Sequence, residues 1–250
     1  MKEIRVKAII FDYGNTIAHE PFFDVLKLKM SDFQKAIEKF GYKFKKKEII
    51  NSWTKADEEV DYPHITHFAQ ELPVIEEALK RLGVKRSDRL KLSKEFLRIY
   101  REGYRKLYQN NPRKKEIKRV LDKLKKKGKK LAVFSDGRKY DVGNALKFYG
   151  ISKYFKFILS SEELGVEKPN PLVFKTLLKR IKESAGDVVH VGDNPVKDVQ
   201  AAKQAGLKTI LYIPPKKYRR SVPWRNYNIK INVKPDAVIK KFSNLERILI

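Results

Sequence analysis

The chain has no cysteine, and it has few acidic residues for its size. Without cysteine it forms no disulfide bond, no thiolate metal site and no cysteine nucleophile. It also lacks any uninterrupted apolar run near the roughly 20 residues that a membrane-spanning helix needs. The first eleven residues are too short and too charged for a signal peptide. These absences predict a soluble cytoplasmic protein with no membrane partner.

Acidic residues are outnumbered almost two to one by basic residues. The 250 residues include 57 Lys and Arg against 30 Asp and Glu, a formal net charge of +27. Such a field attracts anions of every kind, from phosphorylated metabolites to nucleic acid. The simpler interpretation is a Lys-rich composition, which together with only two methionines is typical of thermophiles. Charge alone therefore defines no binding site, while an apolar content of 42% is enough for an ordinary core.

Apolar strands and amphipathic helices alternate in the second half of the chain. The predicted strands are residues 130–135, 155–159, 188–191 and 209–213, and the predicted helices are residues 140–149, 172–181 and 196–205. A further strand is predicted at residues 4–11, directly before Asp12. Strands separated by helices of this length form βαβ units. We therefore expect an α/β fold with a doubly wound, Rossmann-like parallel sheet covered on both faces.

A purely helical stretch separates the first strand from the rest. From about residue 21 to residue 109, apolar residues recur at helical spacing and no strong strand pattern interrupts them. We predict a catalytic core at residues 1–17 and 111–250, with an inserted all-helical module at residues 18–110. Residues 214–234 carry seven basic residues, no acid and three aromatic residues, which indicates a surface excursion.

Polar residues follow the apolar strands at their carboxyl ends. Asp12 follows the first strand, Ser135 ends the second, and Asp193 follows the strand at residues 188–191. Lys168 lies a few residues past the strand that ends near residue 159. The carboxyl ends of parallel strands form the ligand crevice of open α/β sheets, so we expect these four side chains to meet.

Four segments around these residues resemble the motifs of the haloacid dehalogenase-like hydrolases. They are Phe11-Asp12-Tyr13-Gly14-Asn15-Thr16, Phe134-Ser135-Asp136-Gly137, Glu167-Lys168-Pro169-Asn170-Pro171 and Gly192-Asp193-Asn194-Pro195-Val196-Lys197-Asp198. Their order and spacing agree with the family, and together they are far more specific than any one short pattern. The helical module stands where the family inserts its first type of cap, so position alone assigns it as a cap.

The resemblance implies a phosphatase that acts on a small phosphorylated metabolite with Mg²⁺ as cofactor. Mg²⁺ prefers oxygen ligands, and by resemblance these are the carboxylates of Asp12 and Asp193 with the backbone carbonyl of Gly14. Asp198 would be a further ligand or would hold metal-bound water; its other interpretation is a cap for the helix that starts near Val196. Asp12 would also be the nucleophile that forms an aspartyl-phosphate.

Phosphate binding is assigned to the second and third motifs. Lys168 would supply a positive charge beside Asp12 and the phosphate, which makes it both catalytic and phosphate-binding. Ser135 and the backbone amides of Asp136 and Gly137 would donate hydrogen bonds to phosphate oxygens. A carboxylate such as that of Asp136 is unusual beside a bound phosphate. His190 lies inside an apolar strand, which favours a packed core residue over a base.

The first motif departs from the family at Gly14. The usual motif carries an acid at this place, which protonates the leaving oxygen and then activates water. General acid–base help of this kind is worth about 10²–10⁴ in rate. A good leaving group would need it less, and a histidine or acid elsewhere in the sequence could replace it: His19, Glu20, His64 or His67.

Three other functions remain open at this stage. Dehalogenases of the family also lack the second acid, but they need no metal and do not keep an acidic fourth motif, whereas this chain has both Asp193 and Asp198. Phosphonate hydrolases have a small residue at the Gly14 place and use a cap lysine. A weakly active scaffold could instead bind anions or nucleic acid through the basic segment 214–234.

Overall fold

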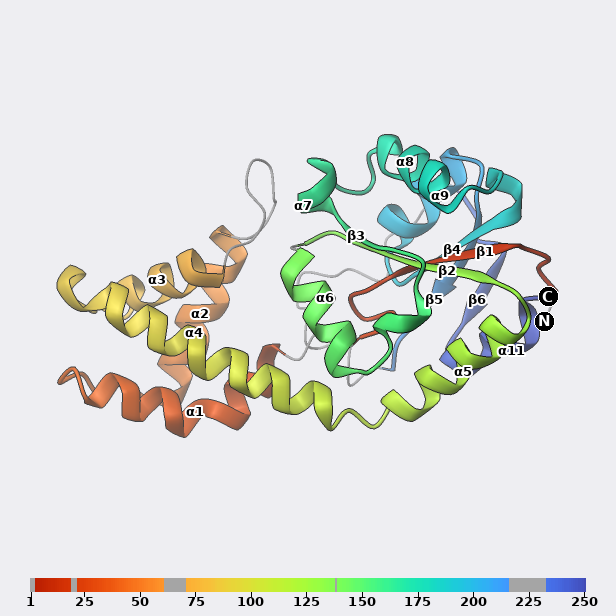
Figure 1. Cartoon of the computed structure of the whole chain (residues 1–250). Helices are drawn as coiled ribbons and strands as arrows, with labels where there is room; N and C mark the ends of the chain where they lie inside the picture. The colour runs from red at the N-terminus through yellow and green to blue at the C-terminus, as the bar shows by residue number, and fades with distance from the viewer. Residues whose placement is uncertain (1–2, 19–21, 61–70, 138, 216–232) are drawn as a thin grey trace. The chain divides into compact units, whose positions relative to one another are not determined.

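The computed structural model describes residues 3–18, 22–60, 71–137, 139–215 and 233–250 (Figure 1). The chain divides into two compact units. One is formed by residues 1–20 and 109–250, and the other by residues 21–108. Among the described residues, no helix is long and apolar enough to cross a membrane.

The larger unit is built on a parallel sheet. In the described residues this sheet has six strands in the order β3-β2-β1-β4-β5-β6, with every neighbouring pair parallel. The strands are β1 (Ala8–Asp12), β2 (Lys130–Ser135), β3 (Ile158–Ser160), β4 (Val188–Gly192), β5 (Lys208–Tyr212) and β6 (Ala237–Ile239). The chain runs outward from β1 to β3 and then returns to β4 on the other side of β1. This reversal confirms the predicted doubly wound, Rossmann-like architecture.

Helices cover both faces of the sheet. They are α5 (Lys114–Lys126), α6 (Lys139–Phe148), α7 (Ser161–Leu164), α8 (Pro171–Ile181), α9 (Ala201–Gln204) and α11 (Leu245–Ile248), with short turns η1 (Ser152–Tyr154), η2 (Ala185–Asp187), η3 (Pro195–Gln200, π-helical) and η4 (Phe242–Asn244). Figure 1 shows α8 and α9 on one face and α5 and α11 on the other.

The pleat of β1 explains why both of its faces are apolar. Ile10 belongs to the core between the sheet and α8, where it shares a cluster with Phe174. The next side chain, Phe11, turns to the opposite face and packs against Phe242 of η4, with ring centroids 5.8 Å apart. Alternate residues of a strand point to opposite faces, so a central parallel strand must be apolar throughout. All five residues of β1 are buried.

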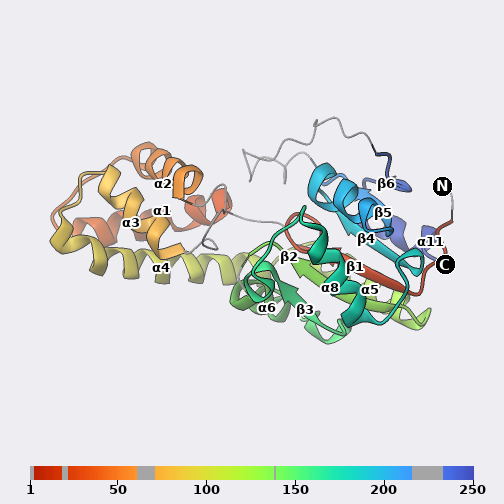
Figure 2. The same ribbon diagram turned by 90° about the horizontal axis from the view of Figure 1, so that it is seen from above.

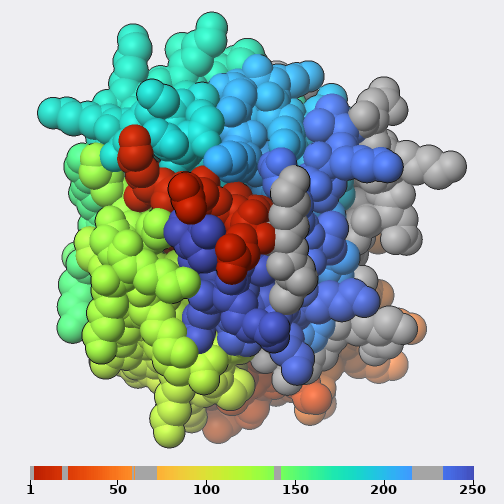
Figure 3. Space-filling view, turned by 90° about the vertical axis from the view of Figure 1, so that its right-hand side faces the viewer, coloured from red at the N-terminus to blue at the C-terminus, as the bar shows by residue number. Residues whose placement is uncertain are grey.

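The predicted boundaries shift where the chain makes distant contacts. β1 begins at Ala8 rather than residue 4, because Ile4 pairs with the other end of the chain. The backbone N–H of Ile4 donates to the carbonyl of Ile248 at 2.7 Å, and Ile250 N–H donates to the carbonyl of Ile4 at 3.2 Å. In Figure 3 the red N-terminal residues lie beside the dark blue C-terminal ones.

The smaller unit is helical and has its own core. Its helices are α1 (Phe22–Glu38), α2 (Lys46–Val60), α3 (Glu71–Arg81) and α4 (Arg86–Gln109) (Figure 2). Trp53 of α2 lies at the centre of the core, stacked on Phe96 with centroids 5.6 Å apart and edge-on to Phe33 at 5.2 Å. Aromatic pairs of this kind add about 0.5–1.5 kcal/mol beyond burial. Among the described residues, the cluster around Trp53 is built from residues of this unit alone.

Candidate active site

Three strand ends bring Asp12, Ser135 and Asp193 to one edge of the sheet. Asp12 is the last residue of β1 and is paired in register with Phe134 of β2, so Ser135 follows at the same edge. Asp193 directly follows β4, which lies on the other side of β1. Lys168 comes from the segment between α7 and α8 and is only 3% exposed. Ligands of open α/β sheets bind at this edge.

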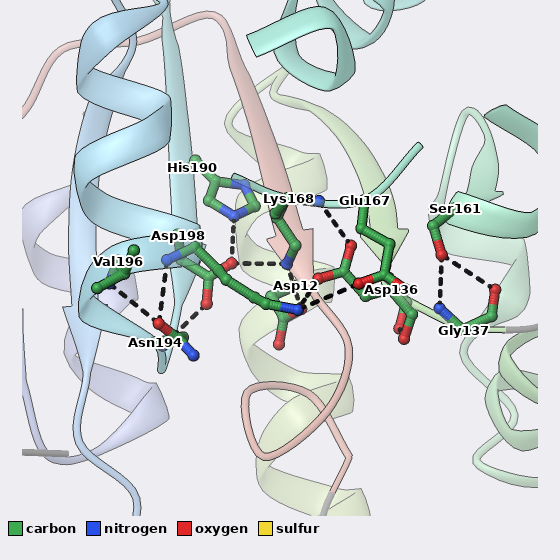
Figure 4. A network of polar contacts seen from close by, with 12 residues as sticks. Asp12, Asp136, Gly137, Ser161, Glu167, Lys168, His190, Asn194, Val196 and Asp198 are labelled. Atoms are coloured by element: carbon green, nitrogen blue, oxygen red, sulfur yellow. Dashed lines mark hydrogen bonds and ion pairs between the residues drawn. The ribbon is translucent and has the colours of Figure 1, made fainter. Parts of the chain in front are cut away.

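Lys168 joins two of the carboxylates. Its Nζ lies 2.7 Å from Asp12 Oδ1 and 2.6 Å from Asp198 Oδ1, and Figure 4 shows it between them. Burial by itself would lower the pKa of Lys168, but the charges of Asp12, Asp198 and Asp136 outweigh it and raise that pKa. Lys168 is therefore a fixed cation at neutral pH.

Asp198 is held by three donors. Its Oδ1 accepts from Lys168 Nζ and lies 3.0 Å from Nε2 of His190, and its Oδ2 accepts the backbone N–H of Asn194 at 2.9 Å. Burial would raise the pKa of Asp198, but the Lys168 charge and His190 lower it well below its usual range. Both oxygens of Asp198 are therefore engaged by the protein, and Oδ1 contacts Lys168 directly.

Gly192 makes room for Asp198. A Cβ atom at Gly192 would lie 2.2 Å from Asp198 Cγ, far inside van der Waals contact. The helix cap at this point is Asn194, whose Oδ1 accepts the N–H groups of Val196 and Lys197 at 3.0 Å each. Asp198 lies one turn further and folds back over the strand, where the missing side chain of Gly192 leaves space for it.

Three buried carboxylates could hold a cation. Oxygen atoms of Asp12, Asp193 and Asp198 lie within 4.8 Å of one another, and the residues are 6%, 1% and 1% exposed. Carboxylates this close repel one another unless a cation shares them. Mg²⁺ fits the donor set, because it takes hard oxygen ligands and needs only one or two carboxylates from the protein.

Asp136 has protein partners of its own. Its Oδ1 accepts the backbone N–H of Lys168 at 3.0 Å, and its Oδ2 lies 3.1 Å from Nζ of Lys197. The same Nζ lies 3.4 Å from Oε2 of Glu167. The carboxylate is thus neutralised by a lysine and bonded to the backbone of the third motif, which accounts for an acid at this place.

The rest of the second motif is buried beside it. Ser135 is 5% exposed and its Oγ donates to the carbonyl of Asp136 at 3.4 Å. The N–H of Gly137 donates to Oγ of Ser161 at 2.9 Å (Figure 4). Gly14 is buried, and its backbone forms an isolated bridge with Ala18.

Sequence reasoning missed two contributors to this site. His190 is fully buried and packs edge-on against Phe174, as a core residue would, but it also contacts Asp198. The sequence signal for His190 is the two-residue period of a strand. His190 and Gly192 lie on the same face of β4, so a side chain that covers Gly192 must also contact His190. Lys197 was one lysine among many, and no local pattern distinguished it.

Several candidates suggested by the sequence lie outside the described residues. They are His19, Glu20, His64 and His67, which were considered as replacements for the missing acid, and residues 216–232 of the basic segment 214–234.

Comparison with known proteins finds hydrolases that are similar to this chain. A family model described as haloacid dehalogenase-like hydrolase matches residues 9–212. The (S)-2-haloacid dehalogenase 2 of Pseudomonas sp. is 25% identical over 100% of this chain and 97% of its own length. The phosphoglycolate phosphatase of Aquifex aeolicus is 34% identical, over 48% of this chain and 58% of that protein. Among solved structures, a phosphatase from Thermococcus onnurineus has a TM-score of 0.61 and 20% identity, covering 97% of both chains.

Proposed function

The chain belongs to the haloacid dehalogenase-like hydrolases, and we propose that it is a Mg²⁺-dependent phosphatase that acts on a small phosphorylated metabolite through Asp12. The observation that carries the proposal is the buried group of Asp12, Asp193 and Asp198, with Lys168 bonded to two of its members. A hydrolase that needed no metal would have no use for Asp193 in this group.

Asp12 is the nucleophile in this proposal. Lys168 lies 2.7 Å from its Oδ1 and places a positive charge beside the carboxylate, and a nearby opposite charge favours the ionised form that a nucleophile requires. One Asp12 oxygen forms a bond to phosphorus while the bond from phosphorus to the leaving oxygen breaks, and the leaving oxygen takes a proton from water because Gly14 supplies none. Water then attacks the aspartyl-phosphate, which releases inorganic phosphate and restores Asp12.

The other residues hold the reacting groups. Asp12 and Asp193 would bind Mg²⁺, with the Gly14 carbonyl as a third protein ligand; the ion would neutralise phosphate charge during the attack. Lys168 would contact a phosphate oxygen, and Asp198 keeps it aimed at Asp12. Ser135 would donate its hydroxyl to another phosphate oxygen.

The helical unit at residues 21–108 is proposed as the cap. It has an independent core and is inserted between β1 and the rest of the sheet, where a module that selects substrates is attached in this family. The residues that contact the substrate's organic group would then come from this unit.

A screen of phosphorylated metabolites and p-nitrophenyl phosphate, with and without Mg²⁺, tests the proposal. We expect turnover that requires Mg²⁺ and that Asp12→Asn abolishes, because an amide is not a nucleophile. Lys203→Met is the control, since Lys203 pairs with Asp236 and does not belong to the site. Undiminished turnover in EDTA would refute the metal role.

A dehalogenase is the second candidate, because the full-length relative from Pseudomonas sp. carries that name. The same nucleophile would then attack carbon bearing a halogen, and no metal would be needed. Release of chloride from 2-chloropropionate in EDTA, with no phosphate ester hydrolysed, would favour this candidate over a phosphatase. The buried group around Asp193 argues against it.

A further inference from the structure

Lys197 links three segments of the candidate site through ion pairs. It belongs to η3, directly before Asp198, and its Nζ lies 3.1 Å from Asp136 Oδ2 and 3.4 Å from Glu167 Oε2. Asp136 directly follows Ser135, and Glu167 directly precedes Lys168. Each member of this ion network is therefore the chain neighbour of a residue that the proposed chemistry uses.

The network is sheltered enough for its charges to matter. The side chains of Lys197, Asp136 and Glu167 are 27%, 13% and 19% exposed. Burial raises the pKa of Glu167, and the nearby charge of Asp136 adds to that effect while Lys197 opposes it. Two carboxylates in such a place repel each other and any incoming phosphate unless a cation lies between them.

One bond carries the effect of the network to the catalytic lysine. Asp136 uses its Oδ1 to accept the backbone N–H of Lys168 at 3.0 Å, while its Oδ2 faces Lys197. The orientation of the Asp136 carboxylate is therefore fixed by the Lys168 backbone N–H at one oxygen and by Lys197 at the other. If Lys197 were removed, Asp136 would turn towards solvent and release the backbone at Lys168.

We propose that Lys197 is a positioning residue that holds Asp136 against the backbone of Lys168 and offsets the negative charge of Asp136 and Glu167 beside the phosphate position. The first part depends only on the contacts around Asp136. The second part rests on the proposed phosphatase function. The two parts are tested separately, so that failure of one is distinguishable from failure of the other.

Amide hydrogen exchange tests the first part without any substrate. Pro169 and Pro171 have no N–H, so exchange within residues 167–171 occurs only at Glu167, Lys168 and Asn170, and NMR spectroscopy follows the Lys168 amide separately. We expect exchange at Lys168 to accelerate roughly tenfold in Lys197→Met, because its N–H would lose a hydrogen bond to a charged carboxylate. Unchanged exchange at Lys168 would overturn the inference, whether or not the protein is a phosphatase.

Lys203→Met is the matched control. Lys203 lies in the same unit, is 26% exposed and pairs with Asp236 at 2.6 Å, but it touches no residue of the site. Exchange in residues 167–171 should be the same in this variant as in the natural protein. An equal acceleration in both variants would show general loosening of the unit and would also overturn the inference.

Affinity for inorganic phosphate, measured by calorimetry with Mg²⁺ present, tests the second part. Lys197→Met should weaken phosphate binding roughly tenfold, because two uncompensated carboxylates then face the anion. The triple variant Lys197→Met/Asp136→Asn/Glu167→Gln removes those charges as well, and the amide oxygen that it introduces at position 136 can still accept from the backbone of Lys168. Its affinity should therefore return to within about threefold of the natural protein. A merely structural lysine would give no such rescue.

The remaining outcomes are also decisive. If the triple variant binds phosphate as poorly as Lys197→Met, the charge role is wrong. If Lys197→Met does not fold, the triple variant must fold, since it leaves no carboxylate unpaired; failure of both to fold would overturn the inference. If the natural protein neither binds phosphate nor hydrolyses esters, the proposed function fails, and the exchange experiment still decides the positioning role.

Discussion

Replacing Gly192 with alanine would test whether Asp198 occupies its observed position in the working enzyme. The new Cβ would lie 2.2 Å from Asp198 Cγ, whereas ordinary contact begins at 3.4 Å, so the carboxylate must move by about 3.4 − 2.2 = 1.2 Å. Its polar contacts are 2.6 Å to Lys168, 3.0 Å to His190 and 2.9 Å to the Asn194 N–H. Hydrogen bonds do not survive a displacement of this size.

The expected losses of stability and of catalytic rate follow from the contacts that Asp198 makes. Breaking a buried ion pair costs about 3–5 kcal/mol, a large share of the roughly 5–15 kcal/mol by which domains are stable. Lys168 would lose the carboxylate that aims it at Asp12, and a misplacement of about 1 Å at a reacting group costs on the order of 10²-fold in rate. We therefore expect Gly192→Ala to lower both the free energy of unfolding and kcat/KM.

Guanidinium unfolding and phosphatase kinetics would measure these two effects. Gly186→Ala is the matched control, because Gly186 lies in η2 before the same strand and a Cβ there meets nothing within 4 Å. It should change stability by no more than about 0.5 kcal/mol. A Gly192→Ala protein with natural stability and turnover would show that Asp198 does not lie over this glycine in solution.

Three further outcomes are expected. Asp193→Asn should remove most Mg²⁺ affinity in calorimetric titrations while the protein stays folded, since it takes one of three like charges out of a buried group. Because Gly14 supplies no acid, log rate should fall steeply with rising leaving-group pKa, and Gly14→Asp should accelerate alkyl phosphates more than p-nitrophenyl phosphate; a flat plot for the natural enzyme would mean that another acid is present. Burial and the 2.5 Å bond to Asp122 raise the pKa of Tyr154 to about 12. The unfolded value is about 10, so the stability from this bond is present below about pH 10 and is lost as the pH rises towards 12. Tyr154→Phe should therefore cost about 1 kcal/mol at neutral pH and abolish that decline in urea titrations at rising pH.

The α/β fold could be predicted from the sequence because its signals are local. The strand at residues 130–135 was predicted at its observed limits, and the stripe of Ile117, Val120, Leu121 and Leu124 is buried along α5. The last turn of that helix ends where Gly128 adopts a φ of +74°, which glycine reaches without strain. At these points the spacing of the apolar residues and a helix-ending glycine were sufficient to predict the structure.

Contacts between distant residues could not be predicted in the same way. The true start of β1 depends on the pairing of Ile4 with residues 248–250, and no local sequence pattern predicts this pairing. The helix predicted at residues 196–205 begins instead as the π-helical turn η3, where Asp198 folds back to the Asn194 N–H. The roles of Asp136 and Lys197 depend on a contact between segments 61 residues apart in the sequence.

The strand order also has a consequence for the time at which the site can assemble. β1 emerges early in synthesis, but its partners β2 and β4 follow only after the helical unit, and Asp12 and Lys168 are separated by 156 positions. Residues 21–108 can collapse around Trp53 as soon as they are complete, since the described residues of the core around Trp53 all lie within this range. Until residue 192 has been made, β1 remains an apolar segment with at least one open edge, which is the kind of segment that aggregates or recruits chaperones. The nascent chain is therefore most vulnerable at the strand that ends in Asp12.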